Sequence, residues 1–237
     1  MSGEKPRISV YVADAGELSR DDLFDRVYAS VSDGRKRKTD RYRFRKDKNL
    51  SLCAEYLLMR ACSEFGVDYK SESVTAFGQG KPRFSRAPVC FSLSHSGERG
   101  MCVMSDREVG CDVEKTGGDH MAVARRFFSA PELSMLEKCK TEGEREELFC
   151  RLWTLKESFI KCTGEGLSLP LDSFSVVDDG EIIKILHTDS GEYAFFEKDL
   201  EGDYRYALCV KLDRGEEEAA FDTVREEQIR VYRTVIS

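Results

Sequence analysis

The stretch Val109-Gly110-Cys111-Asp112-Val113-Glu114-Lys115 alternates apolar and polar residues with a period of two. This period predicts a half-buried strand, and it places Asp112 and Glu114 on one face, roughly 7 Å apart at two residues of strand rise. Two carboxylates held that close repel each other unless a cation lies between them or one stays protonated. A hard divalent cation is the simplest solution.

A second stretch, Leu152-Trp153-Thr154-Leu155-Lys156-Glu157-Ser158-Phe159-Ile160-Lys161, predicts a helix. Glu157 and Lys161 lie one turn apart on it, so they can bring a third carboxylate and an ammonium to the same place. Two simpler explanations stay open at this point. Asp112 and Glu114 could be solvated acids on an exposed strand edge, and Glu157 with Lys161 could be an ordinary helix ion pair.

The composition of the chain indicates a soluble globular protein. Its 237 residues are long enough to bury a sizeable core, and 41% of them are hydrophobic and 34% charged. The net charge of −7 argues against a general nucleic-acid surface or an anionic membrane surface. No apolar run approaches the roughly 20 residues that a membrane span needs.

The cysteines and the N-terminus indicate a cytoplasmic location. Nine cysteines are scattered without a C-x-x-C spacing, which favours a reducing compartment. With only three histidines, a zinc site is not expected. The segment Met1–Pro6 lacks the apolar stretch of a signal peptide.

The first fifth of the chain carries its most uneven charge distribution. A strand is predicted from Ile8 to Val12, followed by a helix to about Val31 that Asp33-Gly34 breaks. A basic block follows: Arg35, Lys36, Arg37, Lys38, Arg41, Arg43, Arg45, Lys46 and Lys48. This block is either a solvated basic face or an anion site for phosphates, which Arg and Lys serve by charge-assisted hydrogen bonds.

The middle of the chain predicts a core helix and a polar loop close to the acidic strand. Residues from Asn49 to Phe65 are apolar on most sides, which predicts a buried helix that ends at Gly66. A strand from Val89 to Leu93 leads into the loop Ser94-His95-Ser96-Gly97. A hairpin is expected to pair 100–104 with 109–114 and so to bring His95 close to Asp112. A charged surface link is expected over 141–147.

Six segments together carry a resemblance to a known family. They are Gly80-Lys81-Pro82, Phe91-Ser92-Leu93-Ser94-His95-Ser96-Gly97, Gly110-Cys111-Asp112-Val113-Glu114-Lys115, Arg126-Phe127-Phe128-Ser129 with Glu132, Trp153-Thr154-Leu155-Lys156-Glu157-Ser158-Phe159-Ile160-Lys161, and Gly164-Glu165-Gly166-Leu167-Ser168-Leu169-Pro170-Leu171-Asp172-Ser173-Phe174. In this order, and with the family's spacing from histidine to aspartate, the chain resembles the Sfp-type 4′-phosphopantetheinyl transferases of the holo-acyl-carrier-protein synthase superfamily. The resemblance covers nearly the whole chain.

The resemblance implies an α+β fold of two similar halves related by a pseudo-twofold axis, residues 1–104 and 105–237, which form one transferase unit. Coenzyme A would bind in the cleft between them. The implied reaction is a Mg²⁺-dependent transfer of the phosphopantetheine arm to a serine hydroxyl on an apo acyl or peptidyl carrier protein, with release of 3′,5′-ADP. The enzyme is expected to act as a monomer, without nucleic acid or membrane as a partner.

The resemblance also implies roles for individual residues. Asp112, Glu114 and Glu157 match the family's magnesium ligands. Ser94, His95, Lys81, Arg35, Lys38 and Ser51 match contacts to the nucleotide and phosphates of coenzyme A, and Lys161 matches the lysine near the pyrophosphate. Glu157, Lys161 and His95 form the implied catalytic set.

Two positions depart from the family's pattern. Arg35 stands where a lysine is common, and Leu50 stands where a basic residue often occurs. The general base stays open between Glu157 itself and a water bound by Glu157. Two other functions also stay open: another Mg²⁺-dependent phosphoanhydride hydrolase, and a non-catalytic module that binds coenzyme A.

Overall fold

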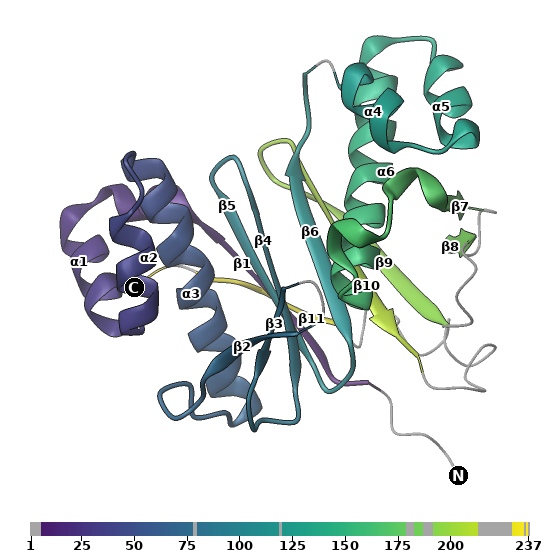
Figure 1. Ribbon diagram of the computed structural model, residues 1–237. Helices are drawn as coiled ribbons and strands as arrows, with labels where there is room; N and C mark the ends of the chain where they lie inside the picture. The colour runs from purple at the N-terminus through teal and green to yellow at the C-terminus, as the bar shows by residue number, and fades with distance from the viewer. Residues whose placement is uncertain are drawn as a thin grey trace.

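The computed structural model describes residues 6–77, 80–118, 120–178, 183–186, 192–212, 229–234 and 236 (Figure 1). Two main sheets organise them. The first has the strand order β11-β1-β5-β4, with the bounds Ile229–Arg233, Ile8–Asp14, Arg99–Ser105 and Cys90–Ser96. The second has the order β6-β10-β9, with the bounds Val109–Lys115, Tyr204–Lys211 and Tyr193–Leu200. Two small hairpins complete the strands: β2 (Val74–Phe77) with β3 (Lys81–Phe84), and β7 (Ser175–Asp178) with β8 (Ile183–Leu186).

The two sheets are connected in the same way, which agrees with the predicted α+β fold of similar halves. In the first, β1 is followed by the long helix α3 (Arg45–Phe65) and then by β4 and β5, with β5 antiparallel to both β1 and β4. In the second, β6 is followed by the long helix α6 (Glu142–Thr163) and then by β9 and β10, with β10 antiparallel to both β6 and β9. Strand β11 pairs in parallel with β1, so it lies in the sheet of the N-terminal residues. The boundary at residue 104 stays a prediction.

The two sheets pack together through a shared apolar core, and the helices cover their outer faces (Figure 1). Period-two alternation explains this arrangement. Val10 and Val103 of the first sheet and Val113 and Leu208 of the second lie in the shared core. Tyr11, the neighbour of Val10, lies instead in the core beneath α3.

The remaining helices flank α3 and α6. Beside α3 lie α1 (Asp21–Ser30), α2 (Asp33–Asp40) and a 3₁₀ turn at Ala15–Ser19; beside α6 lie α4 (Met121–Phe127), α5 (Ala130–Glu137) and 3₁₀ turns at Gly166–Ser168 and Leu171–Ser173. No helix in the described part of the chain is both long and apolar enough to cross a membrane. All nine cysteines, which lie within the described ranges, are free thiols.

The predicted end of the first helix near Val31 was right, because α1 ends at Ser30, but Asp33 and Gly34 do not form the break and instead open helix α2. The hydroxyl of Ser32 caps this helix by accepting a hydrogen bond from the backbone N–H of Arg35, at 3.2 Å. The cap satisfies an N–H that the first turn leaves free, so Gly34 is tolerated inside the helix. The basic block therefore begins on a helix. The predicted end of α3 was right: Gly66 adopts the left-handed conformation, with φ of 69°.

The predicted loop and hairpin near residue 100 were also wrong. Residues 94–96 continue strand β4, and the described turn is confined to Gly97 and Glu98. Strand β5 pairs with β1 and β4, whereas β6 pairs with β10 in the second sheet. The expected surface link over 141–147 is the start of α6, where Thr141 and Glu144 form a capping box.

Serine hydroxyls join strand β4 to strand β6, in an arrangement that we call the serine seam. The hydroxyls of Ser92, Ser94 and Ser96 accept hydrogen bonds at 3.1, 3.3 and 3.2 Å from the backbone N–H groups of alternate β6 residues, 111, 113 and 115. Both sets advance by two residues in the same direction, so the two strands run parallel. The seam brings the end of β4 beside the acidic strand β6. The sequence also predicted this proximity, but from a hairpin that does not form.

Candidate active site

A pocket of about 300 Å³ lies where β4, β6 and α6 meet, and we call it the acidic pocket. It is lined by Leu93, Ser94, His95, Asp112, Glu114, Trp153, Glu157 and Lys161. The structure thus gathers all three predicted magnesium ligands with the predicted catalytic lysine and histidine. These residues come from three elements that are distant in the sequence.

Gly110 lets helix α6 approach strand β6 closely enough to form this pocket. A Cβ atom at Gly110 would lie 2.1 Å from the carbonyl oxygen of Ser158 and 2.3 Å from the backbone nitrogen of Cys162. Two residues of strand rise roughly match one helical turn, about 6.7 Å against 5.4 Å. Asp112 and Glu114, on the same face as Gly110, therefore meet successive turns of α6.

Asp112 is the most constrained acid of the pocket. It is 3% exposed, and its Oδ1 accepts hydrogen bonds from Lys161 Nζ at 2.6 Å and from the Ser94 hydroxyl at 2.7 Å. Burial alone would lower the pKa of Lys161, but the adjacent Asp112 carboxylate raises it, so the ammonium stays charged. The second oxygen, Oδ2, is buried and has no hydrogen-bond partner in the described structure.

Glu114 and Glu157 carry the excess negative charge of the pocket. Burial raises the pKa of both carboxyl groups, and the neighbouring acids raise it further. Glu114 accepts a hydrogen bond from the Ser96 hydroxyl at 2.5 Å, and a hydrogen bond with Trp153 also acts on it. With all three acids ionised, one ammonium, Lys161, leaves two negative charges uncompensated.

A divalent cation fits this charge, although the acids do not form a closed ligand cluster. Within the described ranges, no three His, Cys, Asp or Glu side chains converge closely enough to hold a metal ion as they are placed. The Lys161 ammonium is paired with Asp112 Oδ1 at 2.6 Å, so this oxygen is already used. The buried Oδ2 without a partner and the two uncompensated charges are nevertheless the features that a hard cation would satisfy.

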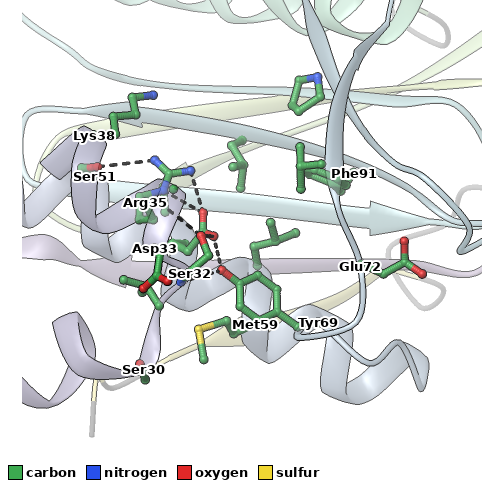
Figure 2. Close-up of a pocket in the computed structure, with 18 of the residues that line it drawn as sticks. Ser30, Ser32, Asp33, Arg35, Lys38, Ser51, Met59, Tyr69, Glu72 and Phe91 are labelled. Atoms are coloured by element: carbon green, nitrogen blue, oxygen red, sulfur yellow. Dashed lines mark hydrogen bonds and ion pairs between the residues drawn. The ribbon is translucent and has the colours of Figure 1, made fainter.

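A second, larger pocket of about 1140 Å³ adjoins the first, and we call it the large pocket (Figure 2). Arg35 and Lys38 from α2, Ser51 from α3, and Phe91 and His95 from β4 are among its lining residues. Leu93 and His95 line both pockets, so the two cavities are neighbours along β4.

Arg35 and Lys38, two of the cationic residues that line the large pocket, are held differently. Arg35 is tied to Glu55, 2.6 Å from its guanidinium, and Tyr69 and Ser32 also donate to this carboxylate (Figure 2). The ammonium of Lys38 has no ion pair or hydrogen bond within the described residues, and burial together with Arg35 lowers its pKa. Its ammonium is thus available to a ligand, whereas that of Arg35 is partly neutralised. Of the basic block, only these two side chains line the pocket.

Lys81 does not lie where the resemblance implied. Its ammonium is buried and donates to Glu108 Oε2 and to the carbonyl of Cys162, both at 2.9 Å. The neighbours Gly80 and Pro82 line the large pocket, but Lys81 does not. The alternation of strand β3 turns its side chain toward α6 instead. Lys81 therefore links strand β3 to helix α6.

A buried ion pair that was not predicted from the sequence lies next to Glu157 in the chain. Lys156 and Glu132 are both 0% exposed at their side chains, with Lys156 Nζ 2.7 Å from Glu132 Oε2 and 2.7 Å from the carbonyl of Phe174. Glu132 also accepts from the backbone N–H groups of Ser129 and Val176. The capping box at Ser129 signals Glu132, but no local pattern distinguishes Lys156 from a surface lysine.

The fold and the two pockets define an α+β enzyme that handles a phosphorylated ligand. The acidic pocket brings three carboxylates to one ammonium, and the large pocket is lined by Lys38, whose ammonium has no protein partner in the described structure. His95 lies between them, and partial burial together with Lys161 lowers its pKa, which favours the neutral ring at pH 7.

Comparison with known proteins agrees with this class. Residues 108–209 match the model of the 4′-phosphopantetheinyl transferase superfamily. A 4′-phosphopantetheinyl transferase of Bacillus subtilis is 36% identical over 191 residues, which cover 78% of this chain and 84% of the relative. The 4′-phosphopantetheinyl transferase Sfp of Bacillus subtilis strain 168 is 33% identical with the same coverage. The chain belongs to the 4′-phosphopantetheinyl transferase superfamily, and it is an enzyme of this class.

Proposed function

We propose that this enzyme transfers the 4′-phosphopantetheine arm of coenzyme A to a serine hydroxyl of an apo acyl or peptidyl carrier protein, with Mg²⁺ as cofactor and 3′,5′-ADP as leaving product. The observation that supports this most directly is that the two pockets are neighbours and share His95 in their linings. Coenzyme A carries a 3′-phosphate on its nucleotide and a diphosphate that leads to the arm. The large pocket suits the nucleotide, and the acidic pocket suits the diphosphate.

The large pocket holds the nucleotide end. Lys38 binds the 3′-phosphate, because its ammonium faces the pocket without a protein partner. Arg35 and Ser51 contribute beside it, although Glu55 offsets part of the charge on Arg35. His95, with a neutral ring, donates one hydrogen bond to a phosphate oxygen at the junction of the pockets.

The acidic pocket holds the reacting end. Bound Mg²⁺ would be held by Asp112, Glu114 and Glu157, and it would neutralise charge on the diphosphate oxygens. Lys161, whose side chain is 30% exposed, donates to the oxygen that leaves with 3′,5′-ADP and stabilises the negative charge that develops there. Asp112 and Ser94 keep this ammonium in place.

We assign acceptance of the serine proton to Glu157, directly or through a water that it holds. Burial and the neighbouring acids raise the pKa of its carboxyl group in the metal-free protein, whereas bound Mg²⁺ would lower it. In the described structure no hydrogen-bond donor contacts it, so its oxygens remain available to the serine hydroxyl or to an intervening water.

The test is an intact-mass measurement on a panel of apo carrier proteins incubated with coenzyme A and Mg²⁺. A carrier that gains one phosphopantetheine, in step with 3′,5′-ADP release, supports the proposal. Asp112→Asn and Glu157→Gln, which keep the side-chain shape, are expected to remove the mass gain while circular dichroism stays unchanged. Undiminished transfer by either variant would contradict the roles of these acids.

The same experiment separates the rival functions. A Mg²⁺-dependent hydrolase would release 3′,5′-ADP from coenzyme A without any carrier protein. A non-catalytic module would bind coenzyme A and release nothing. We expect this enzyme to release 3′,5′-ADP only when an apo carrier protein is present.

A further inference from the structure

Glu114 differs from the other acids of the pocket in the way it is held. Asp112 is paired directly with the Lys161 ammonium, at 2.6 Å. The side chains that hydrogen-bond to Glu114 are the neutral Ser96 hydroxyl, at 2.5 Å from Oε2, and the indole of Trp153. Neutral donors fix the direction of a carboxylate without cancelling its charge, which leaves that charge available to a cation.

The Ser96 hydroxyl has a defined direction because its acceptor side is already used. The backbone N–H of Lys115 donates to the Ser96 oxygen at 3.2 Å, through the serine seam. A hydroxyl carries one hydrogen, and here that hydrogen is given to Glu114. Ser96 therefore links the backbone of strand β6 to the carboxylate that follows Val113 on the same strand.

Not every serine of the seam has this second function. The Ser92 hydroxyl accepts a hydrogen bond from the backbone N–H of Cys111 at 3.1 Å. Within the described residues it makes no hydrogen bond to an acid of the pocket. Ser94 accepts from Val113 and donates to Asp112 at 2.7 Å. The seam thus contains one serine that only joins the strands and two that also aim an acid of the pocket.

We propose that Ser96 is a positioning residue for the metal site, which holds the Glu114 carboxylate in the direction that a divalent cation requires. The proposal rests on the function proposed above, in which Glu114 is a metal ligand. Loss of the hydroxyl would let the carboxylate rotate and would raise the cost of ordering it around an ion. Loss of an outer partner of this kind weakens metal affinity by roughly 10- to 100-fold.

The test is a Mn²⁺ titration of the full chain with saturating coenzyme A, followed by electron paramagnetic resonance of the free Mn²⁺. Ser96→Ala is expected to weaken Mn²⁺ binding by roughly 10- to 100-fold. Ser96→Thr keeps the hydroxyl and is expected to restore it. Ser92→Ala removes the matched seam contact without touching an acid, so its Mn²⁺ affinity is expected to stay close to that of the wild type.

Two results would overturn the inference. One is wild-type Mn²⁺ affinity in Ser96→Ala while Glu114→Gln loses it, which would leave the metal site intact but without a role for Ser96. The other is an equal loss of Mn²⁺ affinity in Ser92→Ala and Ser96→Ala. That result would mean that the contact between strands β4 and β6, and not the direction of the Glu114 carboxylate, sets the affinity. Unchanged Mn²⁺ binding in Glu114→Gln would instead reject Glu114 as a ligand and with it the metal part of the proposed function. Thermal unfolding of each variant identifies any that fails to fold.

Discussion

Gly110→Ala is the substitution that most directly tests how the active site is assembled. The added Cβ would lie 2.1 Å from the carbonyl oxygen of Ser158, whereas ordinary contact begins at 3.4 Å. The three nearest neighbours of this Cβ are all backbone atoms of α6, so no side-chain rotation can relieve the overlap. The helix and β6 must move apart by about 0.9 Å to reach the shortest tolerated separation of 3.0 Å, and by about 1.3 Å to reach ordinary contact.

This displacement acts on catalysis more than on folding. Lys161 Nζ lies 2.6 Å from Asp112 Oδ1, and a shift of this size along the line that joins them would break the hydrogen bond. Misplacement of a reacting group by about 1 Å can cost roughly 100-fold in rate, or about 2.7 kcal/mol of transition-state stabilisation. Overpacking of a core contact costs about 1–3 kcal/mol of folding free energy, which a chain of this size tolerates.

The assay is the rate of phosphopantetheine transfer to an apo carrier, with the free energy of unfolding measured in urea on the same preparation. Gly110→Ala is expected to lower kcat/KM by roughly 100-fold while the protein remains folded. Gly143→Ala is the matched control, because Gly143 lies in the same helix α6 and no atom lies within 4 Å of its added Cβ. Wild-type kcat/KM in Gly110→Ala would refute the argument that this glycine sets the distance between α6 and β6.

Three further predictions concern the ligand, the buried ion pair and the response to pH. Lys38→Ala should weaken coenzyme A by roughly tenfold and dephospho-coenzyme A much less, and equal losses in calorimetric titrations would mean that Lys38 does not bind the 3′-phosphate. Lys156→Met should cost about 3–5 kcal/mol in urea unfolding, because it leaves Glu132 buried without its cation, and the double variant with Glu132→Leu should recover part of this loss. Burial opposes ionisation of Glu108, but Lys81 lowers its pKa below 4.5, so wild type should be more stable than Glu108→Gln at pH 7. This advantage should disappear as the pH falls through the lowered pKa, and a difference that persists in thermal unfolding at acid pH would contradict it.

The local patterns of the chain predicted most of its elements and most of its site residues. The period-two alternation around Asp112 predicted β6, and the apolar residues before Gly66 predicted the core helix α3. The three acids with Lys161 were predicted to meet, and the structure brings them into one pocket. These predictions succeeded because burial of an apolar face imposes a period on the sequence itself.

Pairing between strands was less accessible to sequence reasoning. The short turn between β5 and β6 favoured a hairpin, yet the two strands belong to different sheets. A turn sequence constrains only its own backbone, whereas the choice of partner depends on which sheet buries Val109 and Val113 best. The polar loop at His95 was misassigned for a related reason. The serines that suggested a loop lie in strand β4, and their hydroxyls accept hydrogen bonds from backbone N–H groups of β6.

The amino-acid sequence by itself determined the periodic elements, the family and the acids that meet at the site, because these depend on residue types and spacings along one chain. Only the tertiary structure decided that the buried Lys81 links β3 to α6, that Glu55 partly neutralises Arg35, and that Ser96 aims Glu114. Each of these depends on the direction of a side chain relative to an element far away in the sequence. That direction follows from packing, and no local pattern records it.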